Sequence, residues 1–220
     1  MSCLITKMKK VYFISGLGAD KRAFSFLDLS FCEPVYIEWI KPLENESLKS
    51  YALRLKHQIP DPHPVVIGVS FGGMLATEIA KSDPSAKAII IASNKTKTEF
   101  PKIFLAGKYI PAYKWMPPAI LKRASLIRLK FFGPKGEKQR ELFKEILRDA
   151  DTDFSKWAIY SILHWENTEI PSNLTHIHGT SDKLLPFRLV KADYTIEGGS
   201  HLMIMNQHQD ISALLKKLII

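Results

Sequence analysis

Three residues of this chain could together form a nucleophilic site: Ser70, Asp182 and His201. A serine hydroxyl attacks a carbonyl when a base removes its proton, and the usual base is a histidine oriented by a carboxylate. Ser70 is the centre of Gly68-Val-Ser-Phe-Gly72, a G-x-S-x-G pattern preceded by an apolar run. Glycines on both sides of the serine suit a sharp turn from a strand into a helix. The pattern therefore predicts an exposed, nucleophilic serine.

The candidate acid and base each follow a predicted strand. Asp182 comes shortly after Leu174–His178, and His201 comes shortly after Tyr194–Ile196. The carboxyl ends of parallel strands meet at one edge of a sheet, where open α/β sheets bind ligands. Ser70 is expected at that same edge, and the chain order Ser, Asp, His is typical of nucleophiles placed on a strand-to-helix turn.

Carbonyl chemistry also needs N–H donors for the oxyanion that forms when the nucleophile attacks. The Phe71 amide, directly after Ser70, is predicted to supply one donor. The loop after the first predicted strand reads Ile14-Ser-Gly-Leu-Gly-Ala-Asp20, and its two glycines allow it to bend toward the serine. The Leu17 amide is therefore predicted to supply the second donor.

Other residues compete for the acid and base roles. Asp193 is a rival acid, and the rival histidines are His164, His176, His178 and His208. His176 and His178 lie on a predicted strand and are expected to be structural.

Alternating patterns of strands and helices must position these residues. The predicted strands are Val11–Ile14, Val35–Ile40, Val65–Val69, Ala88–Ile91, Leu174–His178 and Tyr194–Ile196, and the helices between and after them include Leu48–Ile59, Phe71–Lys81 and Gln209–Leu218. This alternation predicts an α/β fold with a mostly parallel sheet of about six strands, flanked by helices.

The alternation stops between residues 94 and 165. Helical patterns there cover Ile103–Tyr109, Ile120–Lys130, Glu137–Arg148 and Ser155–Trp165, and Asp151-Thr-Asp153 separates the last two. We expect a helical cap or lid inserted before the last two strands of a single domain spanning residues 1–220. Its aromatic residues, Trp157, Tyr160 and Trp165, have the spacing of core positions, with pocket lining as the alternative.

The positive charge is concentrated in this insertion. Twelve Lys and Arg but only two Glu lie between Lys95 and Arg140, whereas the whole chain has a net charge of +9. Three interpretations stay open: a solvated face of the lid, a docking surface for an acidic carrier protein or a coenzyme A handle, and association with a membrane surface. Nucleic-acid binding is not expected, because no helix-turn-helix, zinc-finger or RNP pattern accompanies the charge.

Composition limits the remaining possibilities. The chain has no run of 18 apolar residues, so no transmembrane helix is expected. The apolar run after Lys10 is too short for a signal peptide, and two cysteines, Cys3 and Cys32, are expected to be free thiols in a reducing cytoplasm. We expect neither a cofactor nor a metal, and the oligomeric state stays open.

Taken together, these motifs resemble those of the α/β-hydrolase superfamily, particularly its small serine esterase-like members. The resemblance rests on the G-x-S-x-G pattern, on Asp182 within H-G-x-x-D-x-x-x-P, and on His201 within G-G-x-H. It implies Ser70 as nucleophile, Asp182 as orienting acid, His201 as base and the Leu17 and Phe71 amides as oxyanion donors. Where the family often has His-Gly in the oxyanion loop, this chain has Ser-Gly.

The resemblance implies a serine hydrolase that cleaves a carboxylic ester or thioester through an acyl-enzyme. A serine at position 70 argues against dehalogenase and epoxide-hydrolase chemistry, in which family members use an aspartate there. Acyl transfer, carbon–carbon hydrolysis or a lyase reaction on the same triad stay open as alternatives, and so does a non-catalytic ligand-binding protein of the same fold.

Overall fold

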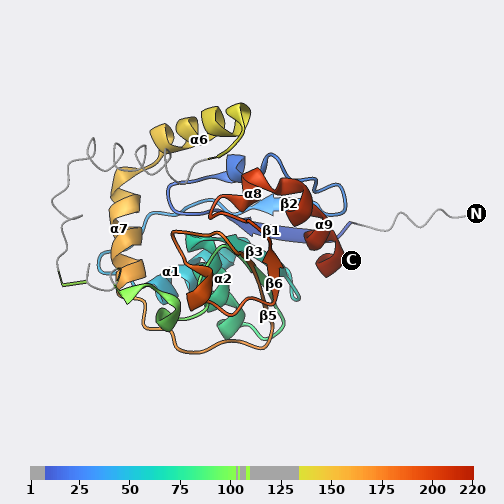
Figure 1. Ribbon diagram of the computed structural model, residues 1–220. Coiled ribbons are helices and arrows are strands. Elements are labelled where there is room, and N and C mark those ends of the chain that lie inside the picture. The colour runs from blue at the N-terminus through green and yellow to red at the C-terminus, as the bar shows by residue number, and fades with distance from the viewer. Residues whose placement is uncertain (1–7, 103, 105–107, 110–133) are drawn as a thin grey trace, which may run out of the picture.

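Six strands form one parallel sheet in the computed structural model, which describes residues 8–102, 104, 108–109 and 134–220 (Figure 1). The strands are β1 (Lys10–Ile14), β2 (Glu33–Tyr36), β3 (Val65–Val69), β4 (Lys87–Ile91), β5 (Leu174–Gly179) and β6 (Tyr194–Ile196). Each strand is parallel to its neighbours, in the order β2-β1-β3-β4-β5-β6. The expected six-stranded parallel sheet is confirmed.

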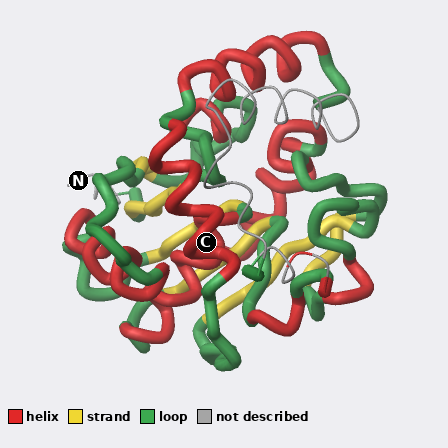
Figure 2. The backbone as a smooth tube through the Cα atoms, turned by 90° about the vertical axis from the view of Figure 1, so that its left-hand side faces the viewer, coloured by secondary structure: helices red, strands yellow, loops and turns green. Residues whose placement is uncertain are grey.

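Helices cover both faces of this sheet (Figure 2). The α-helices are α1 (Leu48–Leu55), α2 (Phe71–Ser82), α6 (Glu137–Asp149), α7 (Thr152–Leu163), α8 (Met203–Asn206) and α9 (His208–Ile219). Short 3-10 helices are η1 (Lys21–Phe24), η2 (Lys56–Gln58), η3 (Lys97–Glu99) and η4 (Phe187–Leu189). No helix among the described residues is long and apolar enough to cross a membrane.

Alternate side chains of each strand enter opposite cores, because successive residues of a strand point to opposite faces. On β1, Tyr12 and Ile14 pack in the core beneath α1, α2 and α7. Val11 and Phe13 pack in the other core, with η1, α8 and α9. Burial on both faces explains why these strands read as almost continuous apolar runs.

The strand order reverses between β1 and β3. The chain leaves β1 to form β2 on one side and returns to form β3 on the other. A crevice at the carboxyl ends of the two strands flanking such a reversal is where open α/β sheets bind ligands. The loop after β1 and the turn after β3 both lie there.

Several predicted boundaries differ from the observed ones; for example, the helix predicted over Leu48–Ile59 ends as an α-helix at Leu55, and two further differences have a clear cause. The strand expected at Val35–Ile40 ends at Tyr36, because its partner β1 ends and the last bond of the ladder runs from the Ile37 N–H to the Phe13 carbonyl (2.9 Å). The helix expected from Ser155 begins at Thr152. Asp151, expected to lie in a break, caps it by accepting the N–H groups of Asp153 (2.8 Å) and Phe154 (3.1 Å).

Within the insertion, the structure describes residues 94–102, 104, 108–109 and 134–165. Asn167 joins the ends, because its side chain donates to the Lys95 carbonyl (2.7 Å) and its own carbonyl accepts the Lys97 N–H (2.8 Å). Lys81 of α2 fixes Asn167 in turn, with 2.6 Å from Nζ to Oδ1. Helices predicted at Glu137–Arg148 and Ser155–Trp165 correspond to α6 and α7, whereas Ile120–Lys130 and most of Ile103–Tyr109 lie outside the described residues.

Candidate active site

Ser70 lies on the turn between β3 and α2, in a backbone conformation that is rare for a residue with a side chain. Its φ is 52° and its ψ is −116°. The turn is fixed from the neighbouring strand, since the Ser70 N–H donates to the Ile91 carbonyl (2.9 Å) and Ser93 Oγ donates to the Ser70 carbonyl (2.6 Å). Strain held in this way by its surroundings is typical of functional sites.

The glycines around Ser70 are required by close backbone contacts. A Cβ on Gly68 would lie 2.2 Å from the Gly72 carbonyl oxygen, and one on Gly72 would lie 2.3 Å from the carbonyl oxygens of Ile14 and Ser15. A side chain at Gly68 would therefore push α2 away from β3, and one at Gly72 would push α2 away from the end of β1. The G-x-S-x-G pattern is thus a consequence of three backbone segments packed against one another.

His201 and Asp182 form a hydrogen-bonded line with Ser70. Ser70 Oγ lies 3.0 Å from His201 Nε2, and His201 Nδ1 lies 2.8 Å from Asp182 Oδ2. With the carboxylate facing Nδ1, the ring carries its proton there, and Nε2 is left to accept the serine proton. The three residues come from loops after β3, β5 and β6, and the structure brings them together at one sheet edge.

Asp182 is buried and held on its other oxygen by the backbone. Oδ1 accepts the N–H groups of Leu184 and Leu185, each at 2.8 Å, in the loop that leads to η4. Burial by itself raises the pKa of Asp182, but the hydrogen bond and charge of His201 and the Leu185 N–H outweigh it, so that pKa lies below the ordinary value. Asp182 is therefore ionised and oriented toward the imidazole.

Two buried histidines of β5, His176 and His178, form a hydrogen-bonded line to the loop that holds Asp182. His176 Nε2 lies 3.1 Å from His178 Nδ1, and His178 Nε2 lies 2.8 Å from the Leu185 carbonyl oxygen. Burial lowers the pKa of both histidines, that of His176 to about 2, so both are neutral. His178 then donates to the Leu185 carbonyl and helps to fix the loop whose N–H groups hold Asp182.

The rival residues lie elsewhere. Asp193 Oδ2 accepts the His176 N–H (2.7 Å). His164 stacks on Tyr160, and His208 packs against Phe26.

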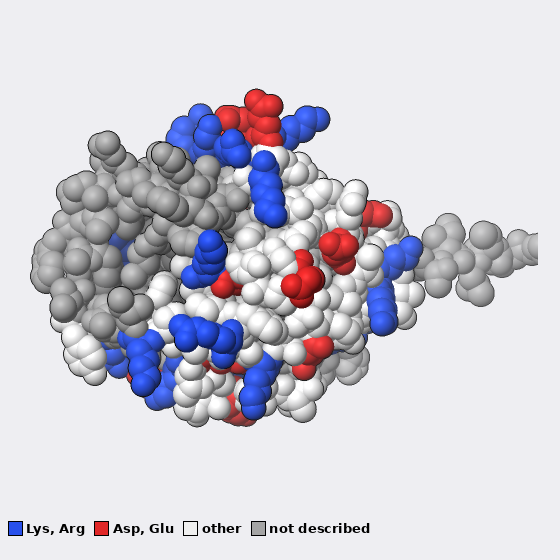
Figure 3. Space-filling model, in the orientation of Figure 1, with Lys and Arg blue, Asp and Glu red and all other residues white. Residues whose placement is uncertain are grey.

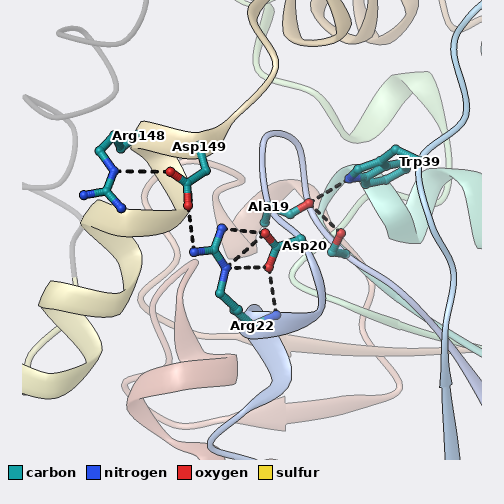
Figure 4. Close-up of polar contacts among 7 residues, drawn as sticks. Ala19, Asp20, Arg22, Trp39, Arg148 and Asp149 are labelled. Carbon is teal, nitrogen blue, oxygen red and sulfur yellow. Dashed lines mark hydrogen bonds and ion pairs between the residues drawn. The ribbon is translucent and has the colours of Figure 1, made fainter.

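Hydrogen bonds to Ala19 hold the loop after β1 (Figure 4). The Ala19 carbonyl oxygen accepts from Trp39 Nε1 (2.7 Å) and from Ser15 Oγ (2.8 Å), and the Ala19 N–H donates to the Gly16 carbonyl (3.0 Å). Ser15, which stands where the family often has histidine, thus closes the loop upon itself. Sequence reasoning did not find the anchoring role of Trp39, because that residue lay within a predicted strand.

A chain of ion pairs continues from this loop to α6. Asp20 accepts from Arg22 Nε (3.0 Å) and Nη2 (2.6 Å), and Arg22 Nη1 donates to Asp149 at the end of α6 (2.9 Å). The Arg22 side chain lowers the pKa of Asp20 and Asp149 through these hydrogen bonds. The tip of the loop, Gly18, has a φ of 72° and faces Ala150, the residue after α6.

Leu17 and Phe71, the predicted oxyanion donors, belong to two segments near Ser70. Phe71 is the first residue of α2, and the first amides of a helix have no partner within it. Leu17 and Gly16 line the pocket that contains Ser70 and His201. Both N–H groups therefore belong to segments that border the nucleophile.

Two cavities meet beside the loop. The pocket containing Ser70 and His201 has a volume of about 190 Å³ and an otherwise apolar lining, with side chains such as Val69, Phe143 and Met205. The second, of about 790 Å³, is lined by aromatic and acidic side chains, including Trp39, Trp157 and Asp153. Ala19 and Ile146 line both.

The aromatic residues of α7 divide between the two expected roles. Trp157 lines the larger cavity and donates to the Glu46 carbonyl (3.0 Å). Trp165, just beyond α7, is a core residue that donates to Glu78 Oε1 (2.7 Å). Tyr160 stacks with His164 and lines neither cavity.

Three lysines in the described part of the basic segment have polar partners. Lys95 is buried and bonds the Lys191 carbonyl, while Lys97 (2.5 Å) and Lys108 (2.9 Å) both pair with Glu166. Over α6, positive and negative side chains alternate at the surface (Figure 3). The stretch from Lys114 to Lys130 lies outside the described residues.

Of the two cysteines, Cys32 is a buried free thiol, and Cys3 lies outside the described residues.

Known proteins share this fold. A lipase-esterase related protein from Clostridium acetobutylicum superposes with a TM-score of 0.71 at 15% identity, over 97% of this chain and 96% of that chain. A thermophilic esterase from Thermogutta terrifontis gives 0.72 at 14% identity, over 97% and 90%. The bottromycin epimerase gives 0.66 at 16% identity, over 97% and 91%. At such identities the likeness shows the fold alone, and no curated protein matches the chain.

A family model settles the relationship. The model described as the alpha/beta hydrolase family matches residues 11–214. This range includes all six strands, apart from Lys10 at the start of β1, and all the candidate site residues. The chain belongs to the alpha/beta hydrolase family.

Proposed function

We propose that the protein is a serine hydrolase that cleaves a carboxylic ester or thioester through an acyl-enzyme. The observation that carries the proposal is the line from Ser70 Oγ to His201 Nε2 (3.0 Å) and from His201 Nδ1 to Asp182 Oδ2 (2.8 Å). Ser70 and His201 line an apolar pocket. Esterases and a lipase-esterase related protein among the similar folds agree with this proposal.

In the first half-reaction His201 takes the proton of Ser70 as Oγ attacks the carbonyl carbon. The oxyanion of the tetrahedral intermediate accepts from the Phe71 and Leu17 amides. Asp182 stabilises the imidazolium that has formed. His201 then gives its proton to the leaving alcohol or thiol, the bond to that group breaks, and an acyl ester remains on Ser70.

Water completes the cycle. His201 removes a proton from a water molecule, which attacks the acyl ester through a second tetrahedral intermediate, and Ser70 regains its proton as the acid leaves. Apart from the substrate and water, both half-reactions use only groups of the chain, so the proposal includes neither cofactor nor metal.

The direct test compares the wild type with Ser70→Ala on short aryl esters and acyl thioesters. We expect kcat/KM to fall at least about a thousandfold, because the nucleophile is gone while binding is retained. Stoichiometric labelling of Ser70 by a fluorophosphonate should accompany wild-type activity. Undiminished activity of Ser70→Ala on the best substrate would sink the proposal.

The same geometry serves other reactions, as the epimerase of the same fold illustrates. Product analysis with competing alcohols or thiols separates hydrolysis from acyl transfer. A ligand-binding protein would fail to react with the fluorophosphonate. The acidic carrier protein or coenzyme A handle stays a prediction, as does a location in the cytoplasm.

A further inference from the structure

We infer that the apolar pocket beside Ser70 accepts a short acyl chain, of at most about seven non-hydrogen atoms, and that Phe143 of α6 limits its length. The inference rests on the proposed function and names the class of substrate for it: esters or thioesters of short hydrocarbon acids.

The first argument is the size of the pocket. Its volume is about 190 Å³, and a dry cavity of about 150 Å³ lined by similar side chains holds benzene, which has six non-hydrogen atoms. In proportion, the pocket accommodates about seven. A decanoyl chain exceeds this volume.

The second argument is the rigidity of the inner walls. Val69, Ile204 and Met205 are 6%, 2% and 1% exposed and belong to the core beneath the sheet. Close-packed core side chains resist displacement, because neighbouring atoms leave them no free volume. These walls therefore set a fixed depth.

Among the described residues, α6 forms a further wall. This helix exposes charged residues along one face and turns Leu142, Phe143, Ile146 and Leu147 toward the protein, and the last three line the pocket. Phe143 has the largest of these side chains and is half-buried, so truncating it removes the most wall volume while the buried Ile146 stays in place. Leu142 packs against the same core but does not line the pocket, which makes it a matched control.

The acyl arm is the part of the substrate that suits a small, apolar pocket. It stays on Ser70 through both half-reactions, whereas the leaving group must depart and be replaced by water. The larger cavity beyond Ala19, with charged residues such as Glu44 and Asp153 in its lining, suits a group that exchanges with solvent. An apolar arm gains from burial at each methylene until the pocket is full.

The experiment measures kcat/KM for two series: p-nitrophenyl esters from acetyl to dodecanoyl, and butanoyl esters of alcohols from ethanol to decanol. In the first series we expect up to about a fourfold gain per methylene to an optimum between four and seven carbons. Beyond it, activity on decanoyl should be at least tenfold lower. The second series should vary less than about threefold.

Variants then test the wall. Phe143→Ala should move the acyl optimum about four carbons longer, and Leu147→Phe should shorten it. Leu142→Ala should keep the wild-type profile, even if it unfolds at a lower temperature, as Phe143→Ala is also expected to do.

The outcomes separate the two proposals. If Ser70 reacts with a fluorophosphonate and esters are cleaved, but Phe143→Ala leaves the chain-length profile unchanged, the inference is wrong and the hydrolase stands. If kcat/KM depends on the length of the alcohol and not on that of the acyl chain, the assignment of the pocket to the acyl chain is also wrong. If no ester is cleaved and Ser70 is not labelled, the proposed function fails, and the inference fails with it.

Discussion

At the scale of single residues, the orientation of one imidazole decides whether this site can work. His201 is useful as a base only when its proton is on Nδ1, and the Asp182 carboxylate at 2.8 Å selects that tautomer. The Leu184 and Leu185 N–H groups hold the other carboxylate oxygen, so the acid cannot turn away. The candidate base therefore depends on two backbone amides that touch neither serine nor substrate.

We predict that Asp182→Asn lowers kcat by about 10³ to 10⁴ while the fold is retained. The asparagine oxygen would take the Leu184 and Leu185 N–H groups, and its NH₂ would face His201 Nδ1. The imidazole would then carry its proton on Nε2 and could not accept one from Ser70. Steady-state kinetics on the best ester measure the loss.

Asp193→Asn serves as the matched control, since that side chain contacts the His176 N–H and not the base. Its kcat should stay within about threefold of the wild type. A large loss in Asp193→Asn, or a small one in Asp182→Asn, would contradict the assignment of the acid.

At the scale of elements, the loop after β1 is tied to α6 by the chain Asp20, Arg22, Asp149 (Figure 4). This loop contains Leu17, the proposed second oxyanion donor, and α6 forms a wall of the pocket. We therefore expect a small displacement of α6 to be transmitted to the donor. Oxyanion stabilisation is sensitive to such displacements because the donors must be in place before the charge develops.

We predict that Arg22→Ala lowers kcat about tenfold with little change in KM. Losing a whole oxyanion donor costs about 10² to 10³, and a misplaced donor should lose part of that. Asp149→Asn, which breaks only the link to α6, should give a smaller loss. Lys144→Ala, which removes an exposed ion pair with Glu141 on the same helix, should have no effect. A change confined to KM would show that Arg22 does not position the donor.

For the whole molecule, two neutral imidazoles inside β5 make stability depend on pH. The folded state holds the pKa of His176 at about 2 and lowers that of His178, while an unfolded histidine titrates near ~6.5. Below that pH the unfolded chain binds protons that the folded chain refuses. This contribution to stability is complete above about pH 6.5 and is lost as the pH falls.

We predict that the free energy of unfolding falls as the pH drops from about 6.5 to about 5, with a slope that approaches about 1.4 kcal/mol per pH unit from His176 and a further contribution of the same sign from His178. In His176→Gln, whose amide can still donate to His178, the slope should decrease by the share of one histidine. Urea unfolding at half-unit steps of pH gives both curves. Parallel curves for the two proteins would contradict the prediction. Asp182, whose pKa is lowered, loses its contribution only in more acidic solution.

Local patterns in the sequence determined the strands, the turn that contains Ser70 and the three candidate residues. Apolar runs predict buried parallel strands because both faces of such strands are covered, and the G-x-S-x-G pattern predicts the turn because only glycine tolerates the contacts at residues 68 and 72. The one strand that was predicted too long, Val35–Ile40, ends where its neighbour ends. Its length was set by pairing, which its own residues do not encode.

Tertiary structure alone decided what surrounds the serine. The Trp39 bond to Ala19 joins residues 20 apart in the chain, and the Arg22 bond to Asp149 joins residues 127 apart. The order of the strands and the packing of α6 over the sheet edge create both. The motifs in the sequence predicted a nucleophile and its partners. The periodicity of apolar residues indicates only which side of an element is buried, and not which other element covers it. The pocket that should choose their substrate became visible only in the folded chain.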